Sequence, residues 1–325
     1  ARAWIDAPDA ATIAADLAWL SAPGHHVLAW TSEDFPALLR DIPAPPAALF
    51  VDGDVSHLWQ PQIAIVGART ATPGGLSNAR AFAQTFAQAG LSVTSGLAEG
   101  IDGAAHASAL DAGGATVAVL GTGLDVIYPR RHEALAARIV GNGALVSEFP
   151  PGTPARPEHF PRRNRIIAGL SLGTLVIEAG LQSGSLITAR LAAEQGRDVF
   201  ALPGSIHSPL ARGCHRLIRD GARLVESAEE VLAELHGMSQ TLAAHLRTRL
   251  DALPKTPESA PASSQTPSHG PDYERLLHAL DHTPAALDEL SARTGLPAGA
   301  LASMLLVLEL EGAVQTQSGR YARAG

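Results

Sequence analysis

The stretch that decides the fold covers residues 63–96 and reads IAIVGARTATPGGLSNARAFAQTFAQAGLSVTSG. Its two ends are short runs with β-branched residues, and each run stops at a glycine. The middle is an alanine-rich stretch of helical character. A strand, a helix and a second strand in this order predict a parallel β-α-β unit, because parallel neighbours need a covering connection.

The same alternation continues to about residue 204. Four further strand-like runs follow, and they read TVAVLG (116–121), GALVSE (143–148), TLVIEA (174–179) and DVFALPG (198–204). Near-continuous apolar strands with helices between them are typical of a sheet that is covered on both faces. We therefore predict an α/β fold with a doubly wound, mostly parallel sheet, in which ligands bind beyond the carboxyl ends of the strands.

Two changes in composition divide the chain. Residues 254–271, PKTPESAPASSQTPSHGP, are rich in proline and serine and offer nothing to a core, which predicts a flexible linker. The first sixty residues contain 2 basic and 8 acidic residues, and we interpret them as a helical remnant and a lead-in strand. The predicted segments are therefore 1–60, a main domain over 61–235, the linker 236–270 and a small domain over 271–325.

Composition excludes several classes of protein. The formal net charge is -8, but residues 61–235 hold 15 basic and 15 acidic residues, so the acidity belongs to the ends. Cys214 is the single cysteine, which excludes an internal disulfide and a cysteine-based zinc site. The sequence has no run of about 18 uncharged apolar residues and no signal segment, so we expect a cytoplasmic protein without membrane insertion.

Five loops should converge at the carboxyl edge of the predicted sheet. The loop VGARTATPGG after the first strand places exposed backbone N–H groups near Gly67 and a helix N-terminus beside Arg69. A lone glycine loop can equally be a tight connection, so the hypothesis depends on the other four loops: SGLAEGID (95–102), GTGLDVIYPRR (121–131), FPRRNR (160–165) and SGSLITA (183–189). They add the remaining candidates for binding an anion, which are Arg130, Arg163, Arg165, Ser95, Gly96, Gly121, Ser183 and Ser185.

Four arginines on one edge favour a polyphosphate or a nucleic-acid backbone as the ligand. A guanidinium stays charged and can contact two phosphate oxygens at once. The alternative for Arg163 or Arg165 is an internal ion pair with Glu148 or Glu178. Both explanations can hold if different arginines have different roles.

Five further residues are expected to support this site. Tyr128 and Phe160 could offer ring faces to unpaired bases, and Asn164 stands between two of the arginines. Asp102 is expected to cap the helix that follows it through backbone N–H groups. His106 is predicted to be a helix residue that is hydrogen-bonded beneath the loops.

Catalysis has weaker support in the sequence. Ser95, Ser183 and Ser185 are candidate hydroxyls, but none stands in a G-x-S-x-G sequence, so we predict no catalytic residue, metal or cofactor. One enzymatic alternative stays open. GTLVIEAG, with Gly173 and Glu178, looks like the G-T-x-x-E portion of the nucleoside-monophosphate phosphoribohydrolases, in which an arginine grips the phosphate and a glutamate assists glycosidic cleavage.

The ordered motifs resemble those of the bacterial DNA-processing protein A family (DprA, also called Smf). The match runs from about Phe35 to Leu235 through VGAR, SGLAEGIDGAAH, TVAVLGTGLDVIYP, GALVSEFPPGTP, FPRRNRIIAGLS and VIEAGLQSGSLITA. This resemblance implies an extended Rossmann-like domain that binds single-stranded DNA and forms a homodimer. It also implies a non-enzymatic role, in which the protein helps to load RecA recombinase onto incoming strands during natural transformation.

The resemblance also assigns roles to individual arginines. Arg162 occupies the variable position of the FPxRNR motif, so the resemblance gives it no role. The arginines carried over as DNA contacts are Arg69 of VGAR, Arg130 after the YP motif, and Arg163 and Arg165 of FPxRNR.

The tail over residues 271–325 is predicted to form three helices and a β-hairpin, and it resembles the winged-helix domain found at the end of many family members. It contains 4 arginines and 7 carboxylates. The recognition helix predicted over 298–311 has no basic residue. Because duplex binding needs phosphate contacts, a protein-contact role is expected for this tail.

Overall fold

The computed structural model describes residues 9–235 and parts of the tail. The described residues of the tail are 271–280, 285, 287–296, 301, 305, 308, 314–317 and 320–323. The chain divides into two compact units, Ala1–Ala252 and Leu253–Gly325. The linker predicted over 236–270 lies outside the described residues.

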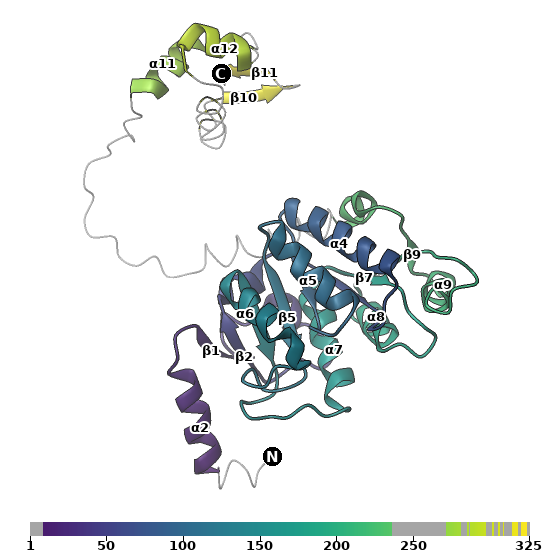
Figure 1. The fold of residues 1–325 in the computed structure, drawn as a ribbon. Coiled ribbons are helices and arrows are strands. Elements are labelled where there is room, and N and C mark those ends of the chain that lie inside the picture. Colours follow the sequence, from purple (N-terminus) through teal and green to yellow (C-terminus); the bar gives the residue numbers. More distant parts are fainter. Residues whose placement is uncertain are drawn as a thin grey trace. The chain divides into compact units, whose positions relative to one another are not determined.

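A nine-stranded sheet forms the centre of the first unit (Figure 1). Its strand order is β1-β2-β6-β5-β4-β3-β7-β8-β9. Strands β3 to β9 pair in parallel, whereas β1 pairs with β2, and β2 with β6, in antiparallel fashion. The doubly wound, mostly parallel sheet predicted from the sequence is confirmed. The strands are β1 (His25–Ala29), β2 (Ala48–Gly53), β3 (Gln62–Gly67), β4 (Ser92–Ser95), β5 (Thr116–Leu120), β6 (Gly143–Ser147), β7 (Gly173–Ile177), β8 (Asp198–Ala201) and β9 (Arg223–Leu224).

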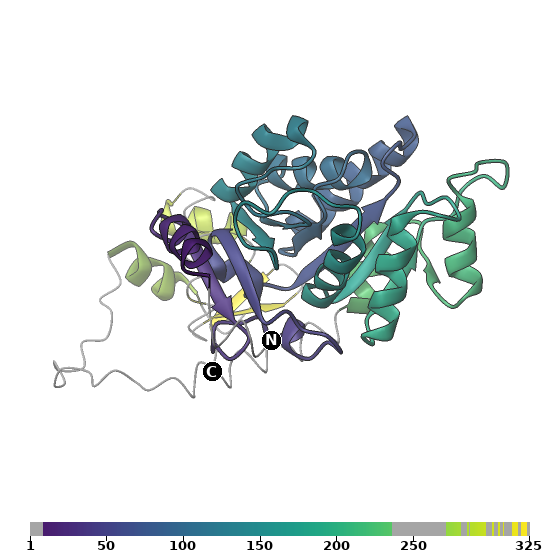
Figure 2. The ribbon, with the colours of Figure 1, turned by 90° about the horizontal axis from the view of Figure 1, so that it is seen from below.

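Helices cover both faces of this sheet (Figures 1 and 2). Helices α4, α5 and α6 pack on one face and α7, α8 and α9 on the other. None of the helices that the structure describes is long and apolar enough to cross a membrane. The helices of this unit include α2 (Ala10–Leu20), α3 (Ala37–Arg40), α4 (Pro73–Gln88), α5 (Ile101–Asp111), α6 (Glu133–Gly141), α7 (His159–Leu170), α8 (Gly184–Glu194) and α9 (Arg212–Arg219), with short 3-10 helices at η1 (Val55–Trp59) and η2 (Arg130–His132), and residues 228–235 are also helical.

The central strands show why helices are needed on both faces. In β3, Ile63 and Ile65 belong to the core beneath α4 and α5, whereas Ala64 and Val66 belong to the core beneath α7 and α8. All four side chains are buried. Because successive residues of a strand point to opposite faces, a strand that is apolar throughout must be covered twice.

The strand order reverses between β3 and β7. Strands β4, β5 and β6 continue from β3 to one side, and β8 and β9 continue from β7 to the other. In open sheets of this kind, ligands bind in the crevice outside the carboxyl ends of the strands at such a reversal. The loops that follow β3 and β7 leave the sheet at this point, and they contain Arg69 and Ser183.

The first sixty residues contribute two strands to the sheet, whereas one lead-in strand was predicted. Strand β2 pairs with β6, with Phe50 opposite Ser147, and β1 forms the outer edge. Phe35 and Leu39 are fully buried in the core beneath α7. The sheet and its core therefore extend across the boundary predicted at residue 60.

The second unit has its own small core. Helices α11 (Pro271–Ala279) and α12 (Leu287–Thr294) precede an antiparallel hairpin of β10 (Val314–Gln317) and β11 (Arg320–Arg323). Leu276, Leu290 and Leu305 are fully buried in this core. The helix predicted over 298–311 lies largely outside the described residues.

Candidate functional site

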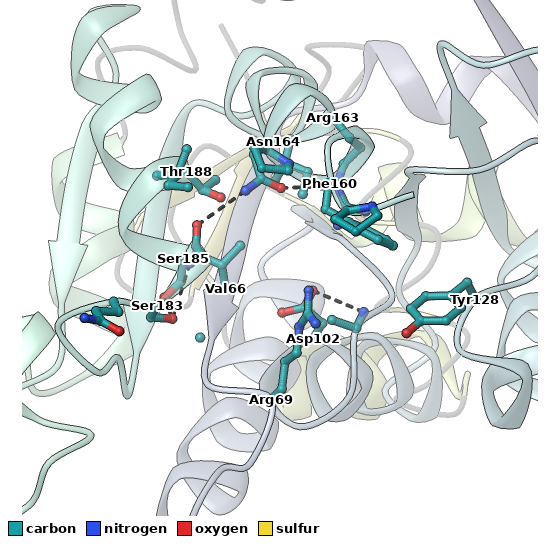
Figure 3. Close-up of a pocket in the computed structure, with 18 residues that line it drawn as sticks. Val66, Arg69, Asp102, Tyr128, Phe160, Arg163, Asn164, Ser183, Ser185 and Thr188 are labelled. Carbon is teal, nitrogen blue, oxygen red and sulfur yellow. Dashed lines mark hydrogen bonds between the residues drawn. The ribbon is translucent and has the colours of Figure 1, made fainter. Parts of the chain in front are cut away.

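A cavity of about 550 Å³ opens where the strand order reverses (Figure 3). The loop after β3, the first half of α7 and the first turn of α8 form its walls. The loops that the sequence predicted to converge therefore do meet. The predicted residues that line this cavity are Gly67, Arg69, Asp102, Tyr128, Phe160, Arg163, Asn164, Ser183 and Ser185.

Arg163 forms part of the cavity wall although its side chain is buried. Its guanidinium donates to the carbonyl of Gly96 at 2.8 Å and to that of Val119. Burial lowers the pKa of Arg163 to about 10; Asp102 opposes this shift and Arg69 adds to it. Arg163 therefore stays charged at neutral pH. Gly96 makes room for it, because a Cβ there would lie 2.6 Å from the Nη2 atom of Arg163.

Asp102 does not cap its helix, which corrects the prediction. Gly100 precedes the first residue of α5, so Asp102 already lies inside the helix as its second residue. Its carboxylate reaches back to accept hydrogen bonds from the backbone N–H groups of Gly96 (3.1 Å) and Ala98 (3.3 Å). Burial raises the pKa of Asp102, although Arg163 and these N–H groups act in the opposite direction. Asp102 thus fixes the loop that follows β4.

Arg69 is the exposed cation of the cavity. Its Cζ atom lies 5.7 Å from the ring centroid of Phe160, and the Cζ atom of Arg163 lies 6.0 Å from the same centroid. The rings of Tyr128 and Phe160 are 5.5 Å apart, and the Tyr128 side chain is exposed. Arg69 has no ion-pair partner within the part of the chain that the structure describes. Its charge is therefore available to a ligand.

The first turn of α8 also opens into the cavity (Figure 3). Ser183 is the N-cap, and its hydroxyl lies 2.7 Å from that of Ser185. Asn164 joins α7 to this turn by donating to the carbonyl of Gly184 at 3.3 Å. The N-terminus of a helix carries a partial positive charge, which favours an anion in the cavity.

Arg165 forms an internal ion pair, which is the alternative that the sequence left open. Its guanidinium binds both carboxylate oxygens of Glu148, and its Nε donates to the carbonyl of Ala44 at 2.8 Å. Arg162 adds a contact of 2.8 Å to the same carboxylate. Burial acts to raise the pKa of Glu148, but the hydrogen bonds from Arg165 and Arg162 bring it below its ordinary value. Arg165 does not line the cavity.

Three other candidates also lie outside the cavity lining. The side chain of Arg130 is 93% exposed, with one carboxylate 3.7 Å away in the next turn. Ser95 is fully buried and donates to the carbonyl of Ile65 at 2.6 Å. Gly121 lies against Phe160, where a Cβ would be 3.0 Å from the ring. Gly121 therefore supports the ring rather than a ligand.

His106 is a fully buried residue of α5, beneath the loops. Its Nδ1 lies 2.7 Å from the hydroxyl of Thr116, and that hydroxyl donates its own proton to the carbonyl of Val93 at 2.5 Å. The Nδ1 atom must therefore carry the histidine proton. The Nε2 atom is buried without a hydrogen-bond partner.

Several lining residues were missed in the sequence analysis. Gln182 directly precedes the predicted loop at 183–189, and Thr188 lies within it, one turn into α8. The helical spacing of Ser185 and Thr188 could have identified the second of these. Pro157 could not have been identified from the sequence, because it lies in the irregular loop between β6 and α7, whose path no sequence pattern predicts.

Glu178 does not line the cavity that Arg69 and Arg163 line. It lines a second cavity of about 330 Å³, and no arginine lines that cavity. Its two carboxylate oxygens accept hydrogen bonds from the backbone N–H and the hydroxyl of Thr72. Three residues separate Thr174 from Glu178, one more than the G-T-x-x-E pattern requires. The site thus lacks the pairing of arginine and glutamate that the phosphoribohydrolase hypothesis needs.

Comparison with known proteins agrees with this architecture. The family model described as DNA recombination-mediator protein A matches residues 26–236. The chain belongs to the DNA recombination-mediator protein A family. The model described as the DprA winged helix domain matches residues 258–320, which confirms the winged-helix prediction for the tail.

Named members of the recombination-mediator family are similar over much of this chain. It is 44% identical to Protein Smf of Escherichia coli over 313 residues, which cover 96% of this chain and 81% of that protein. It is 48% identical to the DNA processing protein DprA of Streptococcus pneumoniae over 200 residues, which cover 62% of this chain and 71% of that protein.

Two solved structures of the family resemble the fold. DNA processing protein A from Streptococcus pneumoniae superposes with a TM-score of 0.62 at 44% identity, over 65% of this chain and 75% of that one. The protein from Helicobacter pylori, whose structure concerns its mode of binding single-stranded DNA, superposes with a TM-score of 0.60 at 28% identity, over 66% of this chain and 96% of that one.

Proposed function

We propose that this chain binds single-stranded DNA through the cavity around Arg69 and Arg163. We further propose that it acts without catalysis, as a recombination mediator that helps to load RecA onto incoming strands in natural transformation. The observation that carries the proposal is the unneutralised charge of Arg69 over the ring of Phe160. Membership of the recombination-mediator family and the DNA-binding relative from Helicobacter pylori support it.

The charges of the cavity suit one phosphate group. The charged residues that line the cavity are Arg69, Arg163 and Asp102, which leaves an excess of one formal positive charge, and the N-terminus of α8 adds to it. Phe160 and Tyr128 offer aromatic surface beside this charge. Because only an unpaired base exposes its face for stacking, this combination favours single strands over duplex DNA.

A salt titration tests the role of Arg69. Neutralising one phosphate of a single strand contributes about -0.7 to the slope of log affinity against log salt concentration. We expect Arg69→Ala to weaken binding of a fluorescent oligothymidylate and to make this slope less steep by about 0.7. Arg138→Ala is the matched control, because it removes an exposed arginine of α6 that pairs with Asp111 at the end of α5 and does not line the cavity. Equal affinity and slope for wild type and Arg69→Ala would refute the phosphate site.

Arg163 and Arg130 need different experiments. Arg163 also holds two backbone carbonyls, so Arg163→Lys is preferable to alanine: it keeps the charge, loses the planar fork and should weaken DNA binding. Arg130 is proposed as an outlying phosphate contact because its side chain is exposed and lies two residues after Tyr128 in the chain. Arg130→Ala should then change the salt slope without changing stability.

The cellular role requires a separate assay. The proposal places a homodimer of this protein in the cytoplasm, where it delivers DNA to RecA. With DNA pre-bound by the protein, wild type should shorten the lag before RecA filaments form, whereas Arg69→Ala should not. An Arg69→Ala protein that has lost DNA binding but still shortens the lag would instead indicate a protein-interaction scaffold. Light scattering after gel filtration tests the dimer.

A further inference from the structure

Glu178 has a backbone conformation that is rare for any residue except glycine. It follows β7 with φ of 53°, in the left-handed region. Its neighbour Ala179 is fixed by two backbone hydrogen bonds, one from its N–H to Leu210 (2.6 Å) and one from Gly213 to its carbonyl (2.7 Å). Glycine would adopt this conformation without strain. A glutamate at such a position indicates that the side chain itself is needed.

The carboxylate of Glu178 fastens the end of the loop that carries Arg69. It accepts hydrogen bonds from the backbone N–H of Thr72 at 2.8 Å and from the Thr72 hydroxyl at 2.5 Å. Because that hydroxyl gives its proton to Glu178, its lone pair is free to accept from the N–H of Gly75 (3.0 Å), where it caps α4. Gly75 must be a glycine here, since a Cβ would overlap the carboxylate of Glu178.

The start of the same loop is fastened as well. The carbonyl of Ala68 accepts a hydrogen bond from the N–H of Ile101 at 3.2 Å, and Gly100 lies so close to this backbone that a Cβ would overlap it. Three residues, 69–71, separate this anchor from Thr72. The direction in which Arg69 leaves the backbone is therefore set by α5 at one end and by Glu178 at the other.

We propose that Glu178 is a positioning residue for DNA binding: it holds Thr72, and so fixes the reach of the Arg69 guanidinium into the cavity. This inference rests on the proposed function. It also predicts an effect of unusual sign. Removing a carboxylate near a phosphate site normally strengthens DNA binding, because a like charge is removed. Removal of Glu178 should weaken it, because Arg69 is no longer held in place.

A double-mutant cycle tests the inference in the full chain with fluorescent oligothymidylate. Glu178→Ala should reduce affinity roughly 3- to 10-fold and bring the salt slope to that of Arg69→Ala. In the Arg69→Ala background, Glu178→Ala should not reduce the affinity further, because the guanidinium that Glu178 positions is already absent. Glu194→Ala is the control for lost negative charge, because Glu194 pairs with Arg190 at the exposed end of α8, and its affinity should not fall.

Conservative variants separate positioning from general damage to the fold. Thr72→Ser keeps both donors and should bind DNA like wild type, whereas Thr72→Val loses the hydroxyl and should weaken binding as Glu178→Ala does. The inference is overturned if Glu178→Ala binds DNA as tightly as wild type, or if it reduces the affinity by the same factor in the Arg69→Ala background as in the wild-type background. If Arg69→Ala itself changes neither affinity nor slope, the proposed phosphate site fails instead, whatever Glu178 does.

Discussion

Replacing His106 with asparagine should make the first unit less sensitive to acid. The His106 side chain is fully buried, and its Nδ1–H donates to Thr116. Burial, the neighbouring His132 and the charge of Arg163 together lower the pKa of His106 from 6.5 to about 3. A proton added at Nε2 would have no acceptor and would place a second cation near Arg163.

The direction and size of the effect follow from this shift. Below about pH 6.5 the unfolded chain binds a proton at His106, whereas the folded chain does so only near pH 3. Stability is therefore lost as the pH falls between these values. Each unit of pKa difference corresponds to about 1.4 kcal/mol, so at pH 5 the 1.5 units below the unfolded pKa cost about 2 kcal/mol relative to neutral pH.

Urea denaturation followed by tryptophan fluorescence at neutral pH and at about pH 5 measures this loss. The tryptophans all lie in the first unit, so the signal reports that unit. His106→Asn keeps a donor near the position of Nδ1 and should cost about 1–2 kcal/mol at every pH because atoms are lost from the core. Its stability should then fall about 2 kcal/mol less than that of wild type on acidification. Equal losses in wild type, His106→Asn and the exposed control His207→Asn would refute the reasoning.

Two further predictions concern the packing around the arginines. Glu148→Gln leaves the side chain of Arg165 without its charge partner, so the free energy of unfolding measured with urea should fall by about 2–3 kcal/mol. The salt slope of DNA binding should stay unchanged, because Arg165 does not line the cavity. Gly96→Ala forces a Cβ against the guanidinium of Arg163, so it should lower the free energy of unfolding by about 1–3 kcal/mol and weaken DNA binding. The control is Gly141→Ala, which has no atom near the new Cβ and should change neither measurement.

The central strands could be predicted because their burial leaves a clear pattern in the sequence. Strands β3 to β7 are buried on both faces, and each stands out as a short run with β-branched residues between helices, although β4 is mostly serine and threonine. Strand β1 was missed because it lies at the sheet edge, where Leu28 is its one buried residue and His25 begins it. Strand β9 consists of two exposed residues, and it is a strand because these residues pair with Phe200 and Ala201 of β8. Edge strands depend on partners that local sequence does not reveal.

The candidate site was predictable in its place but not in its details. The rule that strand ends gather loops at one edge brought Arg69, Arg163 and Ser183 together. The rule does not give side-chain partners. Ser95 is still part of β4, so its hydroxyl is enclosed by the sheet, and Asp102 lies two residues beyond the N-cap position of α5, which Gly100 occupies. Both errors arose from a shift of one or two residues at the end of an element.

The position of each arginine on α7 explains why the chain can place three of them together. Arg162 and Arg165 are three residues apart, so they lie on the same side of the helix and share the carboxylate of Glu148. Arg163 points to another side, where it is buried and faces Asp102. Two carboxylates thus compensate most of the charge of this cluster. The excess charge at the cavity belongs to Arg69, which lies on a different loop, and for that reason the loop that holds Arg69 in place should control how well DNA binds.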